Sequence, residues 1–244
     1  MVDPVELPVM VEPQRQAWHA LMDLHESLDS DWTLIGGQLV HLHCAERGAS
    51  PPRPTNDVDT VVNVRASPMM LETFTRTLHD MGFRPETSAD GVQHRWRRDA
   101  AQIDVLTPEG IGERARAKTG VGGAPTISAP GTCQALARSE AVPIVLDGRV
   151  GTVLRPSLVA ALIAKAAART EVSVDRASAR HCDDFLVLAS LISARDFRDT
   201  ELSKKDRTRL RRMVAVCRRD GDSLAVSGRI DALDRLERAS RLTT

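Results

Sequence analysis

The chain has 244 residues, of which 42% are hydrophobic and 27% are charged, and its formal net charge is zero. This composition is typical of a globular protein, and the length allows one large domain or two small ones. Aromatic residues make up only 3% of the chain and tyrosine is absent, which argues against a base-stacking platform for single-stranded nucleic acid.

The cysteines and the apolar segments argue against several other classes. No CxxC pair occurs, so neither a zinc knuckle nor a redox pair is indicated, and free thiols in a reducing cytoplasm are the simplest account of Cys44, Cys133, Cys182 and Cys217. The N-terminal MVDPVELPVM contains acids and prolines where a secretory signal would have basic residues. The longest apolar run, residues 158–164, is far too short to span a bilayer. We therefore expect a cytoplasmic protein with no membrane contact.

In chain order, the first 155 residues mix helical and strand patterns. Helices are predicted at residues 13–28, 37–47 and 67–81, the last of them capped by Ser67. Strands are predicted at residues 33–35, 57–64, 92–98 and 102–106, with two or three more between 135 and 154. The strands at 92–98 and 102–106 should form a hairpin around Arg98-Asp99-Ala100, whereas residues 50–56 and 108–131 are mostly loop.

Beyond residue 155 the periodicity becomes helical throughout. Helices are predicted at residues 156–170, 176–193, 200–219 and 223–241. The expected fold class is α+β: a small mixed sheet flanked by helices in residues 1–155, followed by a helical bundle in residues 156–244. A cleft between the two parts is the natural place for a ligand.

Three aspartates interrupt otherwise apolar strand segments. Asp57 and Asp59 share one face of a strand, about 7 Å apart, and Asp104 stands between Ile103 and Val105. Burying these carboxylates without counter-ions would be costly, and a divalent cation such as Mg²⁺ or Mn²⁺ would relieve that cost. The alternative is an exposed edge strand in which Asp57 is only a turn residue after Asn56.

The residues just before this strand are suited to phosphate. Gly36 and Gly37 lie at the predicted junction between a strand and the helix that follows it, so exposed backbone N–H groups could hold a phosphate there. Arg53 and Thr55 precede the acidic pair and could contact phosphate or ribose. The alternatives are a tight turn that binds no ligand and an arginine that is simply on the surface.

A second group of charged residues occurs in the helical part. Lys165 interrupts an apolar helix and Arg169 follows one turn later, so this cationic pair could bind the β- and γ-phosphates of a nucleotide. Asp184 opens another apolar helix and could orient Lys165 or a ribose. The alternatives are a lysine that extends to the surface and an acid that only complements a helix dipole.

The segment from Lys204 to Arg219 contains eight basic residues and one acidic residue. Such a block is usually a solvated helix face, and the alternative is a contact with a nucleic-acid backbone.

Together, these motifs resemble the nucleotidyltransferase superfamily of the DNA polymerase β type. Its pattern is an apolar strand ending in Gly-Gly, then Asp-x-Asp, then a third Asp on a later strand, and this chain supplies LIGG, NDVDTVV and QIDVL. More narrowly, the chain is similar to the AbiEii-type and MenA-type nucleotidyltransferases, which are toxins of bacterial toxin–antitoxin pairs. RPTNDVD, the lysine helix SLVAALIAKAAAR and the aspartate helix RHCDDFLVLASL carry that likeness, over about residues 30–195.

The resemblance implies a nucleotidyltransferase catalytic domain and a role for each motif. Asp57 and Asp59 would bind Mg²⁺ or Mn²⁺, and Asp104 would be the general base or a third metal ligand. Lys165 would contact the triphosphate and Asp184 would be an active-site acid. The implied reaction transfers a nucleoside monophosphate from an NTP and releases pyrophosphate.

The resemblance also implies partners. In the toxin members the acceptor is the 3′ end of tRNA, so NTP, tRNA and a cognate antitoxin are the expected partners. Transfer to a protein hydroxyl or to a small molecule such as an aminoglycoside remains an alternative, as does a non-catalytic nucleotide-binding module. The cost of keeping three unused buried acids argues against the last alternative.

Overall fold

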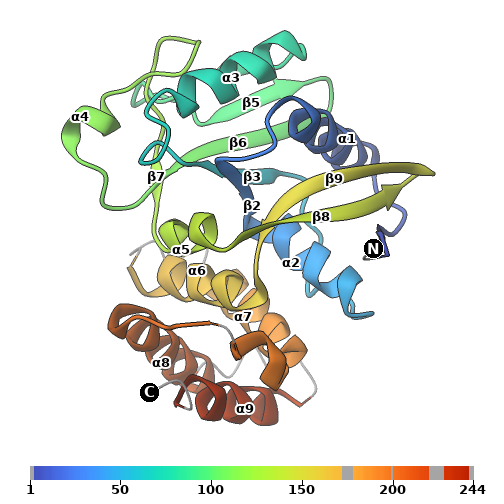
Figure 1. Ribbon diagram of the computed structural model, residues 1–244, viewed down its shortest axis with the longest axis vertical. Helices are drawn as coiled ribbons and strands as arrows, with labels where there is room; N and C mark the ends of the chain where they lie inside the picture. The colour runs from blue at the N-terminus through green and yellow to red at the C-terminus, as the bar shows by residue number, and fades with distance from the viewer. Residues whose placement is uncertain (1–2, 172–177, 199, 220–227, 242–244) are drawn as a thin grey trace.

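The computed structural model describes residues 3–171, 178–198, 200–219 and 228–241. Their strands form two sheets, and four of the described α-helices follow the last strand (Figure 1). The predicted α+β class, with a mixed sheet flanked by helices and a helical C-terminal part, is confirmed.

The larger sheet contains six strands and places the acidic residues. Its order is β2-β3-β6-β5-β4, with β7 added beside β6; the strands are β2 (Trp32–Ile35), β3 (Val58–Val62), β6 (Ala101–Pro108), β5 (Arg95–Arg98), β4 (Arg84–Glu86) and β7 (Ser128–Ala129). β3 and β6 are parallel neighbours, whereas β2–β3, β5–β6 and β4–β5 are antiparallel. The β3–β6 register sets Asp59 directly beside Asp104.

The smaller sheet is a long hairpin with one short added strand. It consists of β1 (Val5–Glu6), β8 (Ser139–Leu146) and β9 (Arg149–Pro156), in the order β1-β8-β9. Asp147 and Gly148 form the hairpin turn with φ angles of 51° and 76°, the positive pair that two-residue β-turns require. This turn joins β8 directly to β9, and the two strands lie in the region where the sequence predicts two or three strands.

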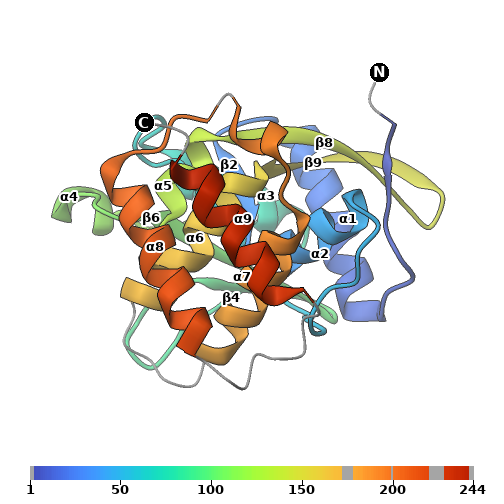
Figure 2. The same ribbon diagram turned by 90° about the horizontal axis from the view of Figure 1, so that it is seen from below.

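The helices divide into an earlier and a later group. The earlier group is α1 (Glu12–Ser27), α2 (Gly36–Glu46), α3 (Met70–Asp80), α4 (Glu113–Arg116) and α5 (Thr132–Ala137). The later group is α6 (Leu158–Glu171), α7 (Ser178–Leu191), the short 3₁₀ helix η2 (Ala194–Phe197), α8 (Lys204–Arg219) and α9 (Arg229–Arg241). Seen from below, α8 and α9 lie outermost, and α6 and α7 lie behind them (Figure 2).

One continuous core joins the sheets to both groups of helices. α1 buries Trp18, Leu21 and Leu24, whose helical spacing places them on one face. α6 is buried over most of its surface because α5, α7 and α8 all pack against it. This explains why its sequence is apolar almost all round, and why a lysine within it needs a partner.

Several predicted boundaries are wrong. Asp57 lies in the loop before β3, because the β2–β3 pairing ends at Asp59. Ser67 does not cap α3, which begins at Met70, because the Ser67 hydroxyl bonds the side chain of Asp31 instead. The strand expected from residue 135 is in part α5, and β4 was not predicted at all.

Other predicted features lie partly outside the described residues. The start of the helix predicted at residues 176–193 falls there, as does the start of the helix predicted at residues 223–241. β9 ends at Pro156 and α6 begins two residues later, while the division into two domains at residue 155 stays a prediction.

None of the four cysteines forms a disulfide, and three of them are buried. Among the helices of the described residues, none combines the length and apolar character needed to cross a bilayer.

Candidate functional site

The three predicted aspartates form one cluster at the edge of the larger sheet. Asp57 ends the loop before β3, Asp59 lies on β3 and Asp104 lies on β6. One carboxylate oxygen from each lies within 4.8 Å of the others. The parallel β3–β6 pairing is what brings together residues that are far apart in the sequence.

The three carboxylates of this cluster disfavour one another's ionisation. The pKa of Asp59 is raised from 3.8 to about 7, mainly by desolvation in the surrounding protein and also by the nearby carboxylates of Asp57 and Asp104. Three hard oxygen donors around one point fit a divalent cation such as Mg²⁺ or Mn²⁺, whose charge would favour the ionised carboxylates. The donor set therefore suits the predicted metal.

The glycine pair allows α2 to begin against these acids. Gly36 has a φ of +74°, and a Cβ atom placed on it would lie 1.8 Å from Oδ2 of Asp59. A Cβ atom on Gly37 would lie 2.8 Å from Cγ2 of Thr55. Both positions thus require glycine, and the unpaired N–H groups of a helix N-terminus lie beside the carboxylates.

Hydrogen bonds from buried polar residues hold the loop that carries Arg53 and Thr55 in place. The Thr55 hydroxyl donates to Oδ1 of Asp57 over 2.7 Å, and Nε2 of Gln38 donates to the Thr55 carbonyl oxygen over 2.7 Å. Gln38 is fully buried, and its own Oε1 accepts hydrogen bonds from Trp18 and Gln14, each over 3.0 Å. Sequence reasoning missed Gln38, although an amide inside an apolar helix directly after Gly-Gly was a signal for it.

Lys165, Arg53 and Asp184 form the cationic wall of the site. The Lys165 ammonium donates to Oδ2 of Asp184 over 2.6 Å, and Nη2 of Arg53 donates to the same oxygen over 3.1 Å. Lys165 is 5% exposed and Asp184 is 1% exposed. Two cations share one carboxylate, so the group keeps a net positive charge beside the three aspartates.

The predicted role of Arg169 does not fit its position. Lys165 lines a cavity of about 170 Å³ together with Gly36, Asp59 and His181. Arg169 lines a different hollow, beside Arg212 and Arg219 of α8. The spacing of four residues was expected to keep Arg169 on the same face as Lys165, but Arg169 lines the hollow between α6 and α8 instead.

His181 gives the cavity a neutral polar wall. Its pKa is lowered to about 4, mainly by burial and also by the nearby Lys165 ammonium. The imidazole is therefore uncharged at neutral pH. The rest of the cavity wall is largely apolar, with Ile35, Leu39 and Leu106 on one side and the alanines of α6 on the other.

Arg95 is a site residue that sequence reasoning missed. Its Nε donates to Oδ1 of Asp104 over 3.1 Å and its Nη2 donates to Oδ2 over 3.0 Å, while Gln102 donates to Oδ1 over 3.2 Å. The hairpin register sets Arg95 opposite Asp104. A two-residue turn at Asp99-Ala100 would have given this pairing from the sequence, because it places Arg98 opposite Ala101.

Comparisons with known proteins identify the fold that carries this site. No protein-family model matches the chain, and no curated protein matches it. A crystal structure of an antigenic nucleotidyltransferase-like protein from Paracoccidioides brasiliensis superposes with a TM-score of 0.55 at 16% identity, covering 93% of this chain and 94% of the other. The solution structure of the antibiotic-resistance factor ANT(2″)-Ia superposes with a TM-score of 0.44 at 16% identity, covering 77% of this chain and 88% of the other. The chain therefore has a nucleotidyltransferase-like fold.

Proposed function

We propose that this protein is a metal-dependent nucleotidyltransferase that transfers a nucleoside monophosphate from an NTP to a hydroxyl acceptor. The observation that carries the proposal is the cluster of Asp57, Asp59 and Asp104, whose carboxylate oxygens lie within 4.8 Å of one another beside a glycine-rich helix start. The nucleotidyltransferase-like fold supports the same reaction class.

In this proposal Asp57 and Asp59 hold Mg²⁺ or Mn²⁺, and Asp104 serves as the general base or as a further ligand. The cation supplies charge that offsets the negative charge developing on the α-phosphate. The acceptor oxygen forms a bond to the α-phosphorus, the bond from that phosphorus to the bridging oxygen breaks, and pyrophosphate leaves. The acceptor proton passes to a carboxylate, for which Asp104 is the candidate.

Arg53, Lys165 and the start of α2 would bind the triphosphate. Asp184 accepts hydrogen bonds from both cations through one oxygen, and Lys165 also lines the cavity that contains Asp59. The N–H groups at Gly36 and Gly37 add the positive end of a helix. Thr55 contributes by holding Asp57 rather than by contacting the nucleotide.

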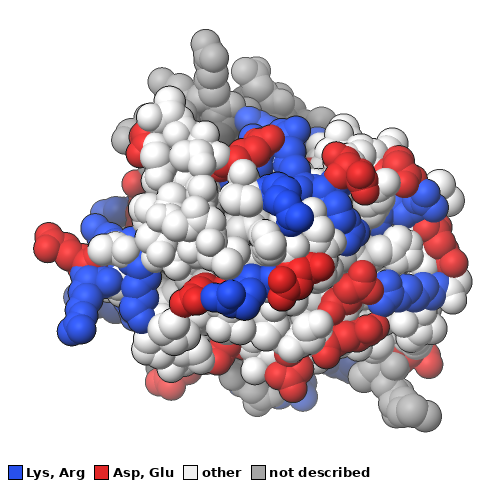
Figure 3. All heavy atoms as spheres, turned by 90° about the horizontal axis from the view of Figure 1, so that it is seen from above, with Lys and Arg blue, Asp and Glu red and all other residues white. Residues whose placement is uncertain are grey.

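We further propose that the acceptor is RNA. α8 presents exposed basic side chains along one face, at Lys204, Lys205, Arg211, Arg212 and Arg219. The opposite end of the molecule differs, because blue and red side chains are intermixed there (Figure 3). Its ion pairs include Arg76 with Glu72, Arg97 with Glu86 and Arg149 with Asp23. A helix whose exposed charged side chains are mainly basic is the better match for a phosphate backbone.

The resemblance to AbiEii-type and MenA-type proteins extends the proposal to the tRNA 3′ end and to a toxin restrained by an antitoxin protein. Induced expression in bacteria tests this extension: the wild-type chain should arrest growth and Asp59→Asn should not. Growth unaffected by the wild-type chain at equal expression would contradict the toxin role while leaving the enzymatic proposal standing.

The enzymatic proposal is tested with purified protein, Mg²⁺, each of the four α-labelled NTPs and total tRNA. We expect labelled tRNA with wild-type protein and with Asp80→Asn, a control that removes an exposed acid from the end of α3, and none with Asp59→Asn. Label on a protein band or on an added aminoglycoside, with tRNA unlabelled, would mean that the acceptor is that protein or aminoglycoside and not tRNA. No label on any of these acceptors with any NTP would contradict nucleotidyl transfer.

A further inference from the structure

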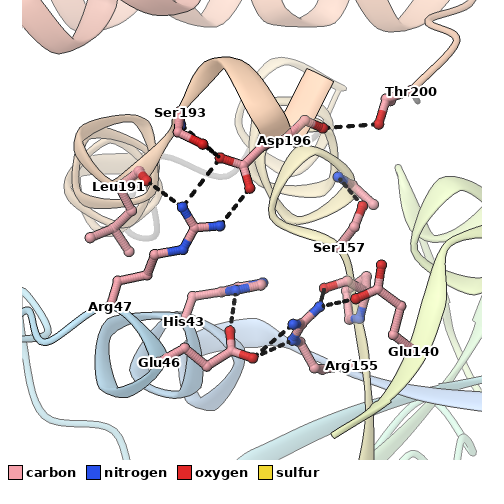
Figure 4. A network of polar contacts seen from close by, with 12 residues as sticks. His43, Glu46, Arg47, Glu140, Arg155, Ser157, Leu191, Ser193, Asp196 and Thr200 are labelled. Carbon is pink, nitrogen blue, oxygen red and sulfur yellow. Dashed lines mark hydrogen bonds and ion pairs between the residues drawn. The ribbon is translucent and has the colours of Figure 1, made fainter. Parts of the chain in front are cut away.

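A second hollow, of about 430 Å³, lies at the far end of α2 from the carboxylates. His43 and Arg47 line it, and they follow Gly36 by seven and eleven residues, or about 10 and 16 Å at 1.5 Å per residue. The other walls come from the start of β8, the end of β9 and the η2 segment (Figure 4). None of the described residues that line it also lines the cavity containing Asp59.

Two arginines of this hollow are matched by carboxylates. Both terminal nitrogens of Arg47 donate to Asp196, over 2.5 and 3.2 Å, and Asp196 is itself fixed by the backbone N–H and the hydroxyl of Ser193. Arg155 donates to Glu46 over 2.7 and 3.0 Å and to Glu140 over 2.7 Å. These pairs form opposite walls of the open space (Figure 4).

Two further arginines have no such match among the described residues. Arg138 donates to the neutral side chain of Gln134 and to the backbone carbonyl oxygen of Glu201. Arg195 is exposed, and no described carboxylate lies within ion-pairing distance of it or of Arg138. The four arginines at the described part of the hollow face three carboxylates, Asp196, Glu46 and Glu140, so one positive charge is in excess, and Arg138 and Arg195 have no carboxylate partner there.

The acids in the hollow do not make it a cation site. Asp196 and Glu46 already accept hydrogen bonds at both of their oxygens, Asp196 from Arg47 and Ser193, and Glu46 from Arg155 and His43. Burial lowers the pKa of His43, which disfavours its positively charged form. What the space offers to a ligand is thus mainly guanidinium donors, which bind phosphate oxygens in a bidentate manner.

We propose that this hollow binds the phosphate of a nucleotide unit, either a free nucleotide or one residue of an RNA chain, through Arg138 and Arg195. Its volume falls in the range of small-molecule sites and exceeds what a single phosphate needs. The apolar side chain of Leu158 and the hydroxyl of Ser157 line the remaining space and can contact the rest of the nucleotide. The proposal does not rest on the catalytic proposal, because it uses none of the carboxylate cluster.

The test compares two double variants by isothermal titration calorimetry in EDTA. Arg138→Gln/Arg195→Gln removes the two unmatched charges, and Arg114→Gln/Arg116→Gln removes the same number of charges from exposed positions on α4. The probes are ADP and a single-stranded RNA oligonucleotide. Without a divalent cation the three aspartates repel both probes, so binding there is suppressed. Melting temperatures equal to that of the wild-type protein establish that both variants fold.

We expect wild-type and α4 control proteins to bind one or both probes alike, and Arg138→Gln/Arg195→Gln to bind at least about tenfold more weakly, because each lost guanidinium–phosphate bond is charge-assisted. The probe that shows the difference identifies the source of the phosphate. Equal affinities for the two double variants, or no binding of either probe to the wild-type protein, would overturn the proposal. Loss of transferase activity in the labelling assay would leave this result unaffected, so the two proposals fail separately.

Discussion

The ammonium of Lys165 donates to the carboxylate of Asp184 over 2.6 Å, with both side chains almost fully buried. Arg53 binds the same carboxylate oxygen from the loop before β3. One buried acid thus connects α6, α7 and the loop that carries Thr55 and Asp57. This contact links the packing of the C-terminal helices to the position of the carboxylate cluster.

Breaking this pair should destabilise the fold more than replacing it. Lys165→Met leaves the buried Asp184 with Arg53 alone, and we expect the free energy of unfolding in urea to fall by about 3 kcal/mol. Lys165→Met/Asp184→Leu removes both charges and should recover most of that loss. If the double variant is as unstable as the sum of the two single variants, the two side chains are not energetically coupled.

Gly36 and Gly48, at the two ends of α2, both have a positive φ. Comparing their substitutions by alanine distinguishes the cost of backbone strain from the cost of a steric clash. Gly48 has a φ of +64° with no neighbouring atom within 4 Å of a Cβ position, so Gly48→Ala incurs only the backbone cost of about 1 kcal/mol. Gly36→Ala adds a clash with Asp59 and should cost at least about 2 kcal/mol more. Urea unfolding measures both, and equal losses would mean that Asp59 moves away freely.

The raised pKa of Asp59 predicts a pH dependence of stability. A carboxyl group whose pKa rises from 3.8 unfolded to about 7 folded stabilises the fold below pH 4, and that contribution is lost as pH rises to 7. In EDTA, Asp59→Asn should therefore match the wild-type protein near pH 3.5 and exceed its free energy of unfolding by up to about 4 kcal/mol above pH 7. A constant difference across this range would contradict the shift.

Arg95 should tune the affinity of the cluster for metal. Its guanidinium occupies both oxygens of Asp104 and adds a positive charge beside the proposed cation. We expect Arg95→Gln to bind Mn²⁺ about fivefold more tightly in calorimetry, by about 1 kcal/mol, and to lose turnover because Asp104 is no longer held. Arg97→Gln, on the same strand, is the control. Weaker Mn²⁺ binding in Arg95→Gln would mean that Arg95 mainly orients a ligand.

The sequence predicted the parts of the fold and of the site that rest on local patterns. Asp59 and Asp104 were recognisable because each interrupts an apolar strand, and strand pairing then brought them together. Ser67 was misread because its hydroxyl bonds Asp31, a partner far away in the sequence. Arg169 was misplaced because helical spacing does not reveal which neighbouring helix packs beside it.

Residues whose role comes from tertiary contact were harder to find. Gln38 supports the Thr55 loop from inside an apolar helix, and although its place directly after Gly-Gly was a signal of burial, its partner lies 17 residues away in the sequence. Arg95 could have been predicted from the hairpin turn, but only once the register was fixed at Asp99-Ala100. The paired arginines and acids of the second hollow come from four separate segments and leave no sequence pattern.

The position of the label in the NTP tests the central claim most directly. Wild-type protein, Mg²⁺ and the acceptor RNA are incubated with one NTP labelled either at the α- or at the γ-phosphate. Nucleotidyl transfer predicts that the α-label enters the RNA while the γ-label is released as pyrophosphate, and that Asp59→Asn does neither. A γ-label in the acceptor, or an α-label that stays in free nucleotide, would contradict the function assigned to the carboxylate cluster.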